Sequence, residues 1–236
     1  MKPFVVCGVD VELIGNDNVL SVGVSTYNLQ TRQHATKLFI MPETVLPTDK
    51  HGVPVLDKSG VLSPHPIDDL GSFSQRRWDF WCQYPKDLAA QVHWPRHRGT
   101  VLSNAAMWQQ IRNHVDDLTV AAARIGSRVR IVSDNLSVDV GIINEHLKQH
   151  VVPRFDGDEV TLDHQLLHVG HDRRHVVTVC AAFPQWQIRK RVILPYDIPF
   201  VCMYFRKHRA DHDALQAALM YAGYINAYPQ VESIKT

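Results

Sequence analysis

The chain has 236 residues, 45% of them hydrophobic, which can fill the interior of one large domain and argues against a disordered chain. Its 25 Lys and Arg residues balance 24 Asp and Glu residues, so the net charge of +1 neither requires nor excludes a nucleic acid as partner. The four cysteines form no C-x-x-C pair, which argues against a zinc knuckle and a disulfide framework.

The apolar run Phe4–Val9 stops at Asp10 and is too short for the core of a signal peptide or for a membrane span. Because no other export or transmembrane segment is visible, we expect a soluble cytoplasmic protein that does not bind a membrane. The sequence leaves the oligomeric state open and is compatible with a homodimer.

Three β-rich runs near the N-terminus predict a meander of strands joined by polar turns. The runs are Phe4–Val9, Val19–Tyr27 and Ala35–Met41. From Pro42 to about Asp69 the density of Pro, Gly, Asp and Ser rises, so we predict no regular element there.

The rest of the chain predicts helices with one further clear strand. Crowded aromatic residues predict a short helix that Pro85 ends, and Ser103 is placed to cap a long helix whose apolar residues recur at helical spacing. The predicted elements are helices within Phe73–Tyr84, over Asn104–Arg124, over roughly Val138–Lys148 and over Asp211–Asn226, a strand over Val129–Val132, a helix-rich stretch after Thr161 and a mixed segment over Val176–Phe205.

The order of these elements predicts an α/β fold with a mixed sheet of about five strands flanked by helices. We expect a single domain over residues 1–236. Loop insertions are expected near residues 42–72 and 169–207.

Asp10 and Glu12 form an acid-x-acid pair at the end of the first predicted strand. Alternation along a strand points both carboxylates to the same side, where they repel each other unless a divalent cation is bound. The same spacing occurs at Asp156 and Asp158 and at Asp211 and Asp213. The spacing alone is therefore weak evidence, and the position at the tip of the first strand is the stronger indication.

Asp139 follows the strand Val129–Val132 and lies at the start of the next helix. If this strand neighbours the first one, Asp139 faces the same edge of the sheet as Asp10. An acid in a first helical turn is also favoured by the helix dipole alone, so both interpretations stay open.

His208 and Asp213 lie at the start of the last predicted helix. A helical Asp213 with His208 on the preceding loop puts a metal ligand and a titratable base in one neighbourhood. The pKa of imidazole suits proton abstraction near neutral pH.

Together these motifs resemble those of the DEDD exonucleases of the histidine subtype, which have a ribonuclease H-like fold. The family patterns are Asp-x-Glu followed by Gly, Asn-x-x-aromatic-Asp, and His-x-Ala-x-x-Asp-Ala. They are matched by Asp10, Glu12 and Gly15, by Asn135 and Asp139, and by His208, Ala210, Asp213 and Ala214. The aromatic stretch Arg77–Pro85 is similar to the region before the long helix in phage exonuclease A proteins and related small exoribonucleases.

Two residues depart from the family pattern. Val138 occupies the place of the usual Phe, which removes a packing ring. Asn16 lies where many relatives carry a Leu that wedges against the terminal base, so Leu13 or Ile14 would have to make this contact. With Asn135 of the second motif, these two residues are the expected substrate-binding positions.

The resemblance implies a 3′-5′ exonuclease that releases nucleoside 5′-monophosphates from a free 3′-hydroxyl of single-stranded nucleic acid, with RNA favoured over DNA. It implies two divalent cations, Mg²⁺ or Mn²⁺, and a His208 that swings over them and takes a proton from the attacking water. The metal ligands would be Asp10, Glu12, Asp139 and Asp213. The alternatives are a DNA-directed proofreading or repair exonuclease and a catalytically silent nucleic-acid-binding module of the same fold.

Other clusters are weaker signals. The pairs His208/His212 and His171/His175 have spacings seen at zinc sites. The first pair lacks the Glu that follows the leading His in zinc peptidase helices, and the second is loop-like with no third ligand nearby. Basic clusters would suit a strand whose phosphates are gripped while its bases stack on aromatic rings. These clusters are at Arg76-Arg77, Arg96–Arg98, Arg173-Arg174, Arg189–Arg191 and Arg206–Arg209. Core packing is the competing interpretation for at least two of Trp78, Phe80 and Trp81.

Overall fold

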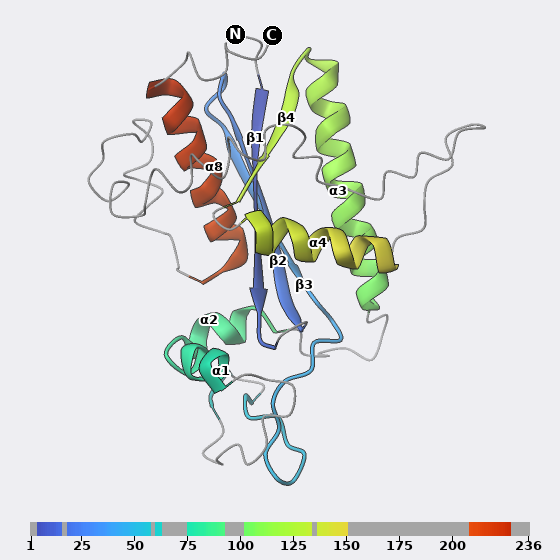
Figure 1. Ribbon diagram of the computed structural model, residues 1–236, viewed down its shortest axis with the longest axis vertical. Coiled ribbons are helices and arrows are strands. Elements are labelled where there is room, and N and C mark those ends of the chain that lie inside the picture. The colour runs from blue at the N-terminus through green and yellow to red at the C-terminus, as the bar shows by residue number, and fades with distance from the viewer. Residues whose placement is uncertain are drawn as a thin grey trace, which may run out of the picture.

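The computed structural model describes residues 4–15, 18–57, 60–62, 75–92, 102–133, 136–150 and 208–227 (Figure 1). The strands are β1 (Phe4–Leu13), β2 (Val19–Asn28), β3 (His34–Ile40) and β4 (Arg128–Val132). The helices are α1 (Gln75–Cys82), α2 (Pro85–Ala90), α3 (Asn104–Arg124), α4 (Leu136–His150) and α8 (Ala210–Ala227). The predictions for the segments after Thr161 and over Val176–Phe205 fall outside these residues.

The strongest local signals in the sequence predicted their elements correctly. Helix α3 begins and ends where its apolar periodicity predicted, and the Ser103 hydroxyl accepts a hydrogen bond from the Ala106 amide, as a helix N-cap does.

The expected end of the first strand was wrong, because β1 continues through Asp10 and Glu12 to Leu13 while paired with β2. Helix α2 was not expected. Pro85 follows α1, but it also begins α2, a position that proline favours.

The sheet is mixed, with the strand order β3-β2-β1-β4. Strand β1 runs antiparallel to β2 and parallel to β4. The expected α/β class with a mixed sheet is confirmed at this level. The described part of the chain has a four-stranded sheet, so the predicted number of about five strands is not confirmed.

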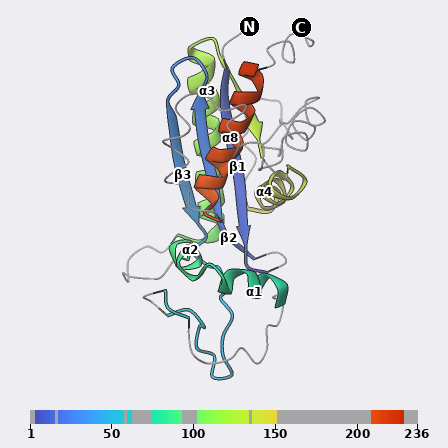
Figure 2. The ribbon, with the colours of Figure 1, turned by 90° about the vertical axis from the view of Figure 1, so that its left-hand side faces the viewer.

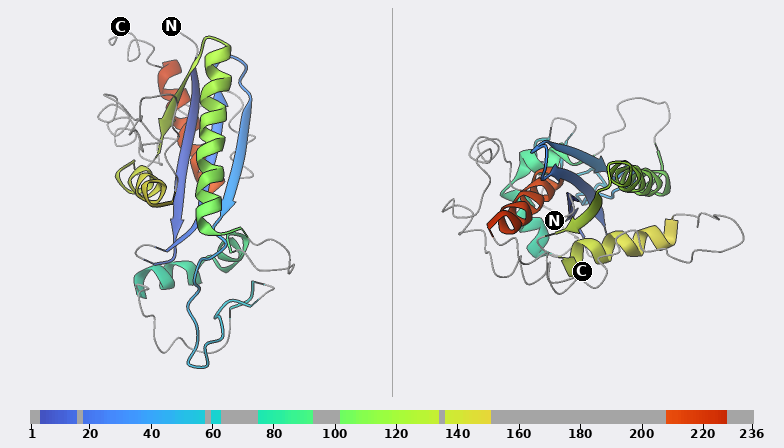
Figure 3. Two further views of the ribbon diagram at one scale, coloured as in Figure 1. Left: turned by 90° about the vertical axis from the view of Figure 1, so that its right-hand side faces the viewer. Right: turned by 90° about the horizontal axis from the view of Figure 1, so that it is seen from above.

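Helices α8 and α3 cover opposite faces of the sheet (Figures 2 and 3). Helix α8 packs on β1 and β2, and α4 packs against α3 and β1. Alternation along β1 places Asp10 and Glu12 on the α8 face, while Val9 and Val11 are buried on the other face. None of the described helices carries an apolar stretch long enough to cross a membrane.

Helix α8 approaches the sheet so closely that only glycine fits beneath it at two positions. A Cβ atom at Gly8 would overlap the carbonyl oxygen of Ala214, and one at Gly23 would overlap that of Ala210. The helix allows this approach because its sheet-facing side is a stripe of small residues, all of them buried. The stripe is Ala210, Ala214, Ala218 and Ala222.

A second hydrophobic core lies beyond the carboxyl end of β1, where α1 and α2 cover the end of the sheet (Figure 1). The chain turns toward this core at a register shift in the pairing of β1 with β2. Glu12 pairs with Ser21 and Leu13 pairs with Val19, so Leu20 is the extra residue of a β-bulge. Ile14 and Leu20 are both fully buried in this second core with Trp81.

The segment before α1 contains no helix or regular strand in its described part, as predicted, but it is built from a repeated turn. The sequence Asp-Lys-x-Gly-Val occurs at Asp49–Val53 and again at Asp57–Val61. In both copies the Asp amide donates to the Val carbonyl at 2.9 Å, and the Asp carboxylate accepts from the Val amide. Gly52 has a φ angle of 74° and Gly60 one of 80°, a conformation that glycine adopts most readily.

Substitution of either buried glycine should destabilise the fold. Gly8→Ala and Gly23→Ala force the sheet and α8 apart, and we expect each to lower the free energy of unfolding by about 1–3 kcal/mol. Gly141→Ala is the matched control, because Gly141 lies on α4 with no neighbouring atom near a new Cβ. It should stabilise the protein by about 0.5–1 kcal/mol through helix propensity. Urea unfolding measures all three, and a Gly8→Ala protein as stable as Gly141→Ala would contradict the packing described.

Candidate metal centre

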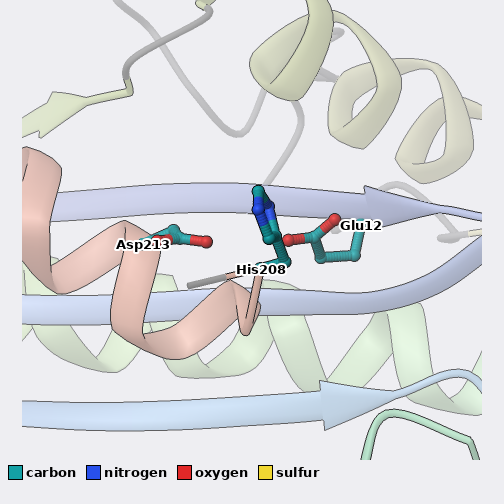
Figure 4. Close-up of side chains that lie close together, drawn as sticks. All are labelled: Glu12, His208 and Asp213. Atoms are coloured by element: carbon teal, nitrogen blue, oxygen red, sulfur yellow. The ribbon is translucent and has the colours of Figure 1, made fainter. Parts of the chain in front are cut away.

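Three side chains from distant parts of the sequence meet at the carboxyl end of β1. The candidate ligand atoms of Glu12, His208 and Asp213 all lie within 4.8 Å of one another. Figure 4 shows the imidazole between the two carboxylates, with Glu12 on β1 and Asp213 on α8. All three side chains are half-buried, so this group is accessible to an ion and partly shielded from water.

The placement of Glu12 follows from the pairing of β1 with β2. Asp10 lies opposite Gly23 and Glu12 lies opposite Ser21, so both acids share the α8 face with small neighbours. The Oδ2 atom of Asp10 is fully buried. Asp10 does not belong to the group of three, but it lies two residues before Glu12 on the same face of β1.

The placement of Asp213 follows from the docking of α8. Its amide donates to the Arg209 carbonyl at 3.0 Å within the first helical turn. The Ser25 hydroxyl on β2 donates to the Asp211 carbonyl at 2.6 Å and fixes this turn on the sheet. Ala210 and Ala214, on either side of Asp213, are fully buried.

His208 lies two residues before the start of α8 and has a left-handed backbone conformation, with φ at 59°. Its carbonyl accepts a hydrogen bond from Gln91 Nε2 at 2.6 Å. Its imidazole packs against the rings of Phe80 and Tyr84, with centroids at 4.5 Å and 4.4 Å. We expected His208 to swing toward the acids when substrate binds, but in this structure its ring already lies beside them.

Asp139 lies in the first turn of α4 and is 4% exposed. The Ser133 hydroxyl donates a hydrogen bond to its Oδ2 atom. The condition that its strand neighbours the first one is met, since Val132 on β4 lies opposite Gly8 on β1. Asp139 is not part of the group of three, and its role as a metal ligand stays a prediction.

The expected substrate-binding residues have different surroundings. Leu13 is half-buried, and its carbonyl accepts a hydrogen bond from Trp81 Nε1 at 2.9 Å. Ile14 is fully buried in the second core, so in this structure it offers no surface to a nucleotide. Asn135 lies outside the described residues. Val138, where relatives carry Phe, is 37% exposed and has no core-packing role.

The aromatic segment divides into core residues and site residues. Trp78 and Trp81 are buried in the second core, which confirms core packing for two of the three aromatic residues considered. Phe80 and Tyr84 are partly buried against the same core, and both also contact His208. Tyr84 and Gln91 were not predicted to be neighbours of the site, although the crowding of aromatic residues before the long helix was a visible signal.

The donor set suits a divalent cation. Two carboxylates whose oxygens lie within 4.8 Å repel by roughly 3 kcal/mol at an effective dielectric constant of about 20, and a bound cation removes that repulsion. Oxygen ligands with one imidazole are compatible with Mg²⁺ and Mn²⁺.

The histidine pair considered for zinc does not converge. His212 lies outside the group of three, and its Nε2 atom is 3.9 Å from Asp211 Oδ2. His208 lies instead with Glu12 and Asp213. The second histidine pair, His171 and His175, lies outside the described residues.

No protein-family model matches the sequence, and comparisons with curated proteins and with solved structures also found no match. The function is therefore inferred from the residues and their geometry. Two features of the molecule support that inference: the spacing of the three motifs in the sequence, and the group that Glu12, His208 and Asp213 form in the structure.

Binding of Mn²⁺ should stabilise the protein through this group. At a hundredfold excess over Kd, one bound ion adds about 2.7 kcal/mol to the free energy of unfolding. We expect Asp213→Asn to remove most of this increment while leaving the metal-free protein at least as stable, because the repulsion from Glu12 is weakened. Thermal unfolding with and without Mn²⁺ measures both effects. Asp117→Asn, on the exposed side of α3, is the control and should keep the full increment.

Proposed function

We propose that this protein is a metal-dependent 3′-5′ exonuclease that acts on single-stranded nucleic acid, with RNA favoured as substrate. One observation carries the proposal: Glu12, His208 and Asp213 meet at one end of the sheet, and they belong to two of the motifs that resemble the DEDD exonucleases. The parallel pairing of β1 with β4 supports a third contribution from Asp139 at the same end. Helix α8, which carries Asp213, is the element that brings the first and last motifs together.

In this proposal Asp10, Glu12, Asp139 and Asp213 hold Mg²⁺ or Mn²⁺. When bound, the ions supply charge stabilisation at the scissile phosphate and lower the pKa of the attacking water. Glu12 and Asp213 also flank the imidazole of His208. The two carboxylates therefore stabilise the positive charge that develops on His208 when it accepts a proton.

His208 accepts the proton of the attacking water at a ring nitrogen. A general base of this kind contributes typically 10² to 10⁴-fold to the rate. The side chain is half-buried and enclosed by two aromatic rings, so its orientation is restricted before substrate binds. This restriction suits a base that must meet the water in one geometry.

A second candidate for the site is a centre with one ion, in which His208 is a ligand beside Glu12 and Asp213. The closeness of an imidazole nitrogen to the two carboxylates favours it, and such mixed ligand sets suit transition metals such as Mn²⁺ or Zn²⁺. Metal affinity distinguishes the two roles. His208→Ala should leave Mn²⁺ affinity unchanged if His208 is a base and weaken it strongly if His208 is a ligand.

The DNA-directed alternative uses the same chemical groups and differs in its substrate. Paired assays on RNA and DNA oligonucleotides of one sequence distinguish it from the RNA-directed enzyme. A silent binding module would not require an imidazole between two carboxylates. It would bind the same oligonucleotides without turnover when Mg²⁺ is added.

The activity itself should depend on a divalent cation and on a free 3′ end. With Mg²⁺ or Mn²⁺ we expect release of nucleoside 5′-monophosphates from single strands, loss of activity in EDTA and recovery on adding metal. A 3′-phosphate should slow degradation strongly, because the reaction starts at the 3′-hydroxyl. Chromatography of the products measures each effect, whereas internal cuts in a circular single strand would contradict the proposed direction.

Replacement of His208 should separate the proton-transfer role from binding. We expect His208→Ala to lower kcat by about 10² to 10⁴-fold, the typical contribution of a general base. The matched control is His212→Ala, since His212 lies outside the group of three and should tolerate the change. Steady-state kinetics on a labelled oligonucleotide measures both. A crippled His212→Ala enzyme beside a healthy His208→Ala enzyme would show that the motif is aligned wrongly.

A further inference from the structure

Gln91 holds the turn that carries His208. Its side chain is fully buried and uses both ends of its amide. Oε1 accepts from the Ser21 hydroxyl at 2.5 Å and from the Ala210 amide at 3.3 Å. Nε2 donates to the His208 carbonyl at 2.6 Å. Gln91 thus joins β2, the end of α2 and the turn before α8, and it holds the backbone on both sides of Arg209.

This anchoring fixes an unusual backbone conformation. His208 has a φ of 59°, which residues other than glycine adopt rarely and at a cost in free energy. The hydrogen bond from Gln91 to the carbonyl of the same residue stabilises that conformation. The direction in which the imidazole leaves the backbone is therefore set by a residue far away in the sequence.

Two aromatic rings enclose the imidazole. Phe80 meets it edge to face at 83°, and Tyr84 meets it at 56°. The two rings also contact each other, with centroids 5.2 Å apart. Such tilted contacts are the favourable arrangements for aromatic pairs, so the rings restrict the χ angles of His208.

The helix that carries Phe80 is itself attached to the end of β1. Trp81 is buried and donates a hydrogen bond to the Leu13 carbonyl at 2.9 Å, and Arg77 donates to the Gly15 carbonyl. Glu12 lies on the same strand, immediately before Leu13. The rings and the carboxylate therefore share one rigid support, which fixes their mutual positions.

We propose that Phe80, Tyr84 and Gln91 are positioning residues that hold the His208 imidazole beside Glu12 and Asp213. The inference rests on the proposed function, in which His208 accepts the proton of the attacking water. Gln91 lies outside every segment that suggested the function, whereas Phe80 and Tyr84 lie in the aromatic stretch Arg77–Pro85 but outside the three motifs. Loss of positioning lowers the rate of the chemical step and leaves substrate binding intact.

Single substitutions test the kinetic consequence. Phe80→Leu and Tyr84→Leu remove a ring and keep an apolar side chain, and we expect kcat to fall by about 10- to 100-fold with little change in KM. Tyr84→Phe keeps the ring and should retain wild-type kinetics. A raised KM with unchanged kcat would instead show that the rings stack on a nucleobase, and it would overturn the proposal.

The same substitutions in a His208→Ala background separate positioning from general support of the fold. If Phe80 and Tyr84 act through His208, their replacement should have no further effect on the residual kcat of His208→Ala. A ring that only supports the fold lowers kcat by the same factor in both backgrounds. That additive result would contradict the proposal.

A measurement without turnover keeps the inference separate from the proposed function. The ring currents of Phe80 and Tyr84 should displace the imidazole NMR signals of His208, which His208→Ala identifies by their loss. Phe80→Leu, Tyr84→Leu and Gln91→Leu should each move these signals while those of remote α3 residues stay in place. Unmoved signals overturn the positioning role, whereas wild-type protein without metal-dependent nuclease activity overturns the proposed function alone.

Discussion

The close contact of α8 with the β1–β2 pair is the constraint on which the candidate site depends. Glycines at positions 8 and 23 let the helix backbone lie where a Cβ would otherwise be. Ala210 and Ala214 make this contact from the helix side, and Asp213 is thereby held beside Glu12. The alanines of the last motif therefore have a packing role that is as definite as the chemical role proposed for its Asp and His.

This packing concentrates negative charge at the carboxyl end of β1. Glu12 and Asp213 lie close together there with the imidazole of His208 between them, and the buried alanine stripe holds α8 against the sheet. Phe80 and Tyr84, which pack against the second core, contact the imidazole of His208. The fold thus gathers a group of side chains whose chemistry suits a divalent cation.

Local patterns in the sequence predicted much of this structure. The periodicity and cap of α3 act within a few residues, and strand alternation placed Asp10 and Glu12 on one face. Pairing with β2 extends β1 through those acids, and the alternation of Val9, Val11 and Leu13 with the two acids is a local signal of that extension. The contacts of Gln91 and Tyr84 with His208 join residues far apart in the sequence, so they depend on tertiary packing. The repeated Asp-Lys-x-Gly-Val turn is a local signal that was not among the predictions.

The central claim is that the acids at the end of β1 and the start of α8 bind a catalytic metal at a 3′ terminus. A crystal soaked with Mn²⁺ and a nucleoside 5′-monophosphate tests it most directly, because anomalous scattering locates the ions independently of any assumed mechanism. We predict anomalous peaks at the carboxylates of Asp10, Glu12 and Asp213, with the nucleotide phosphate in contact with the ions. Peaks confined to other positions, with no ion at these carboxylates, would contradict the account.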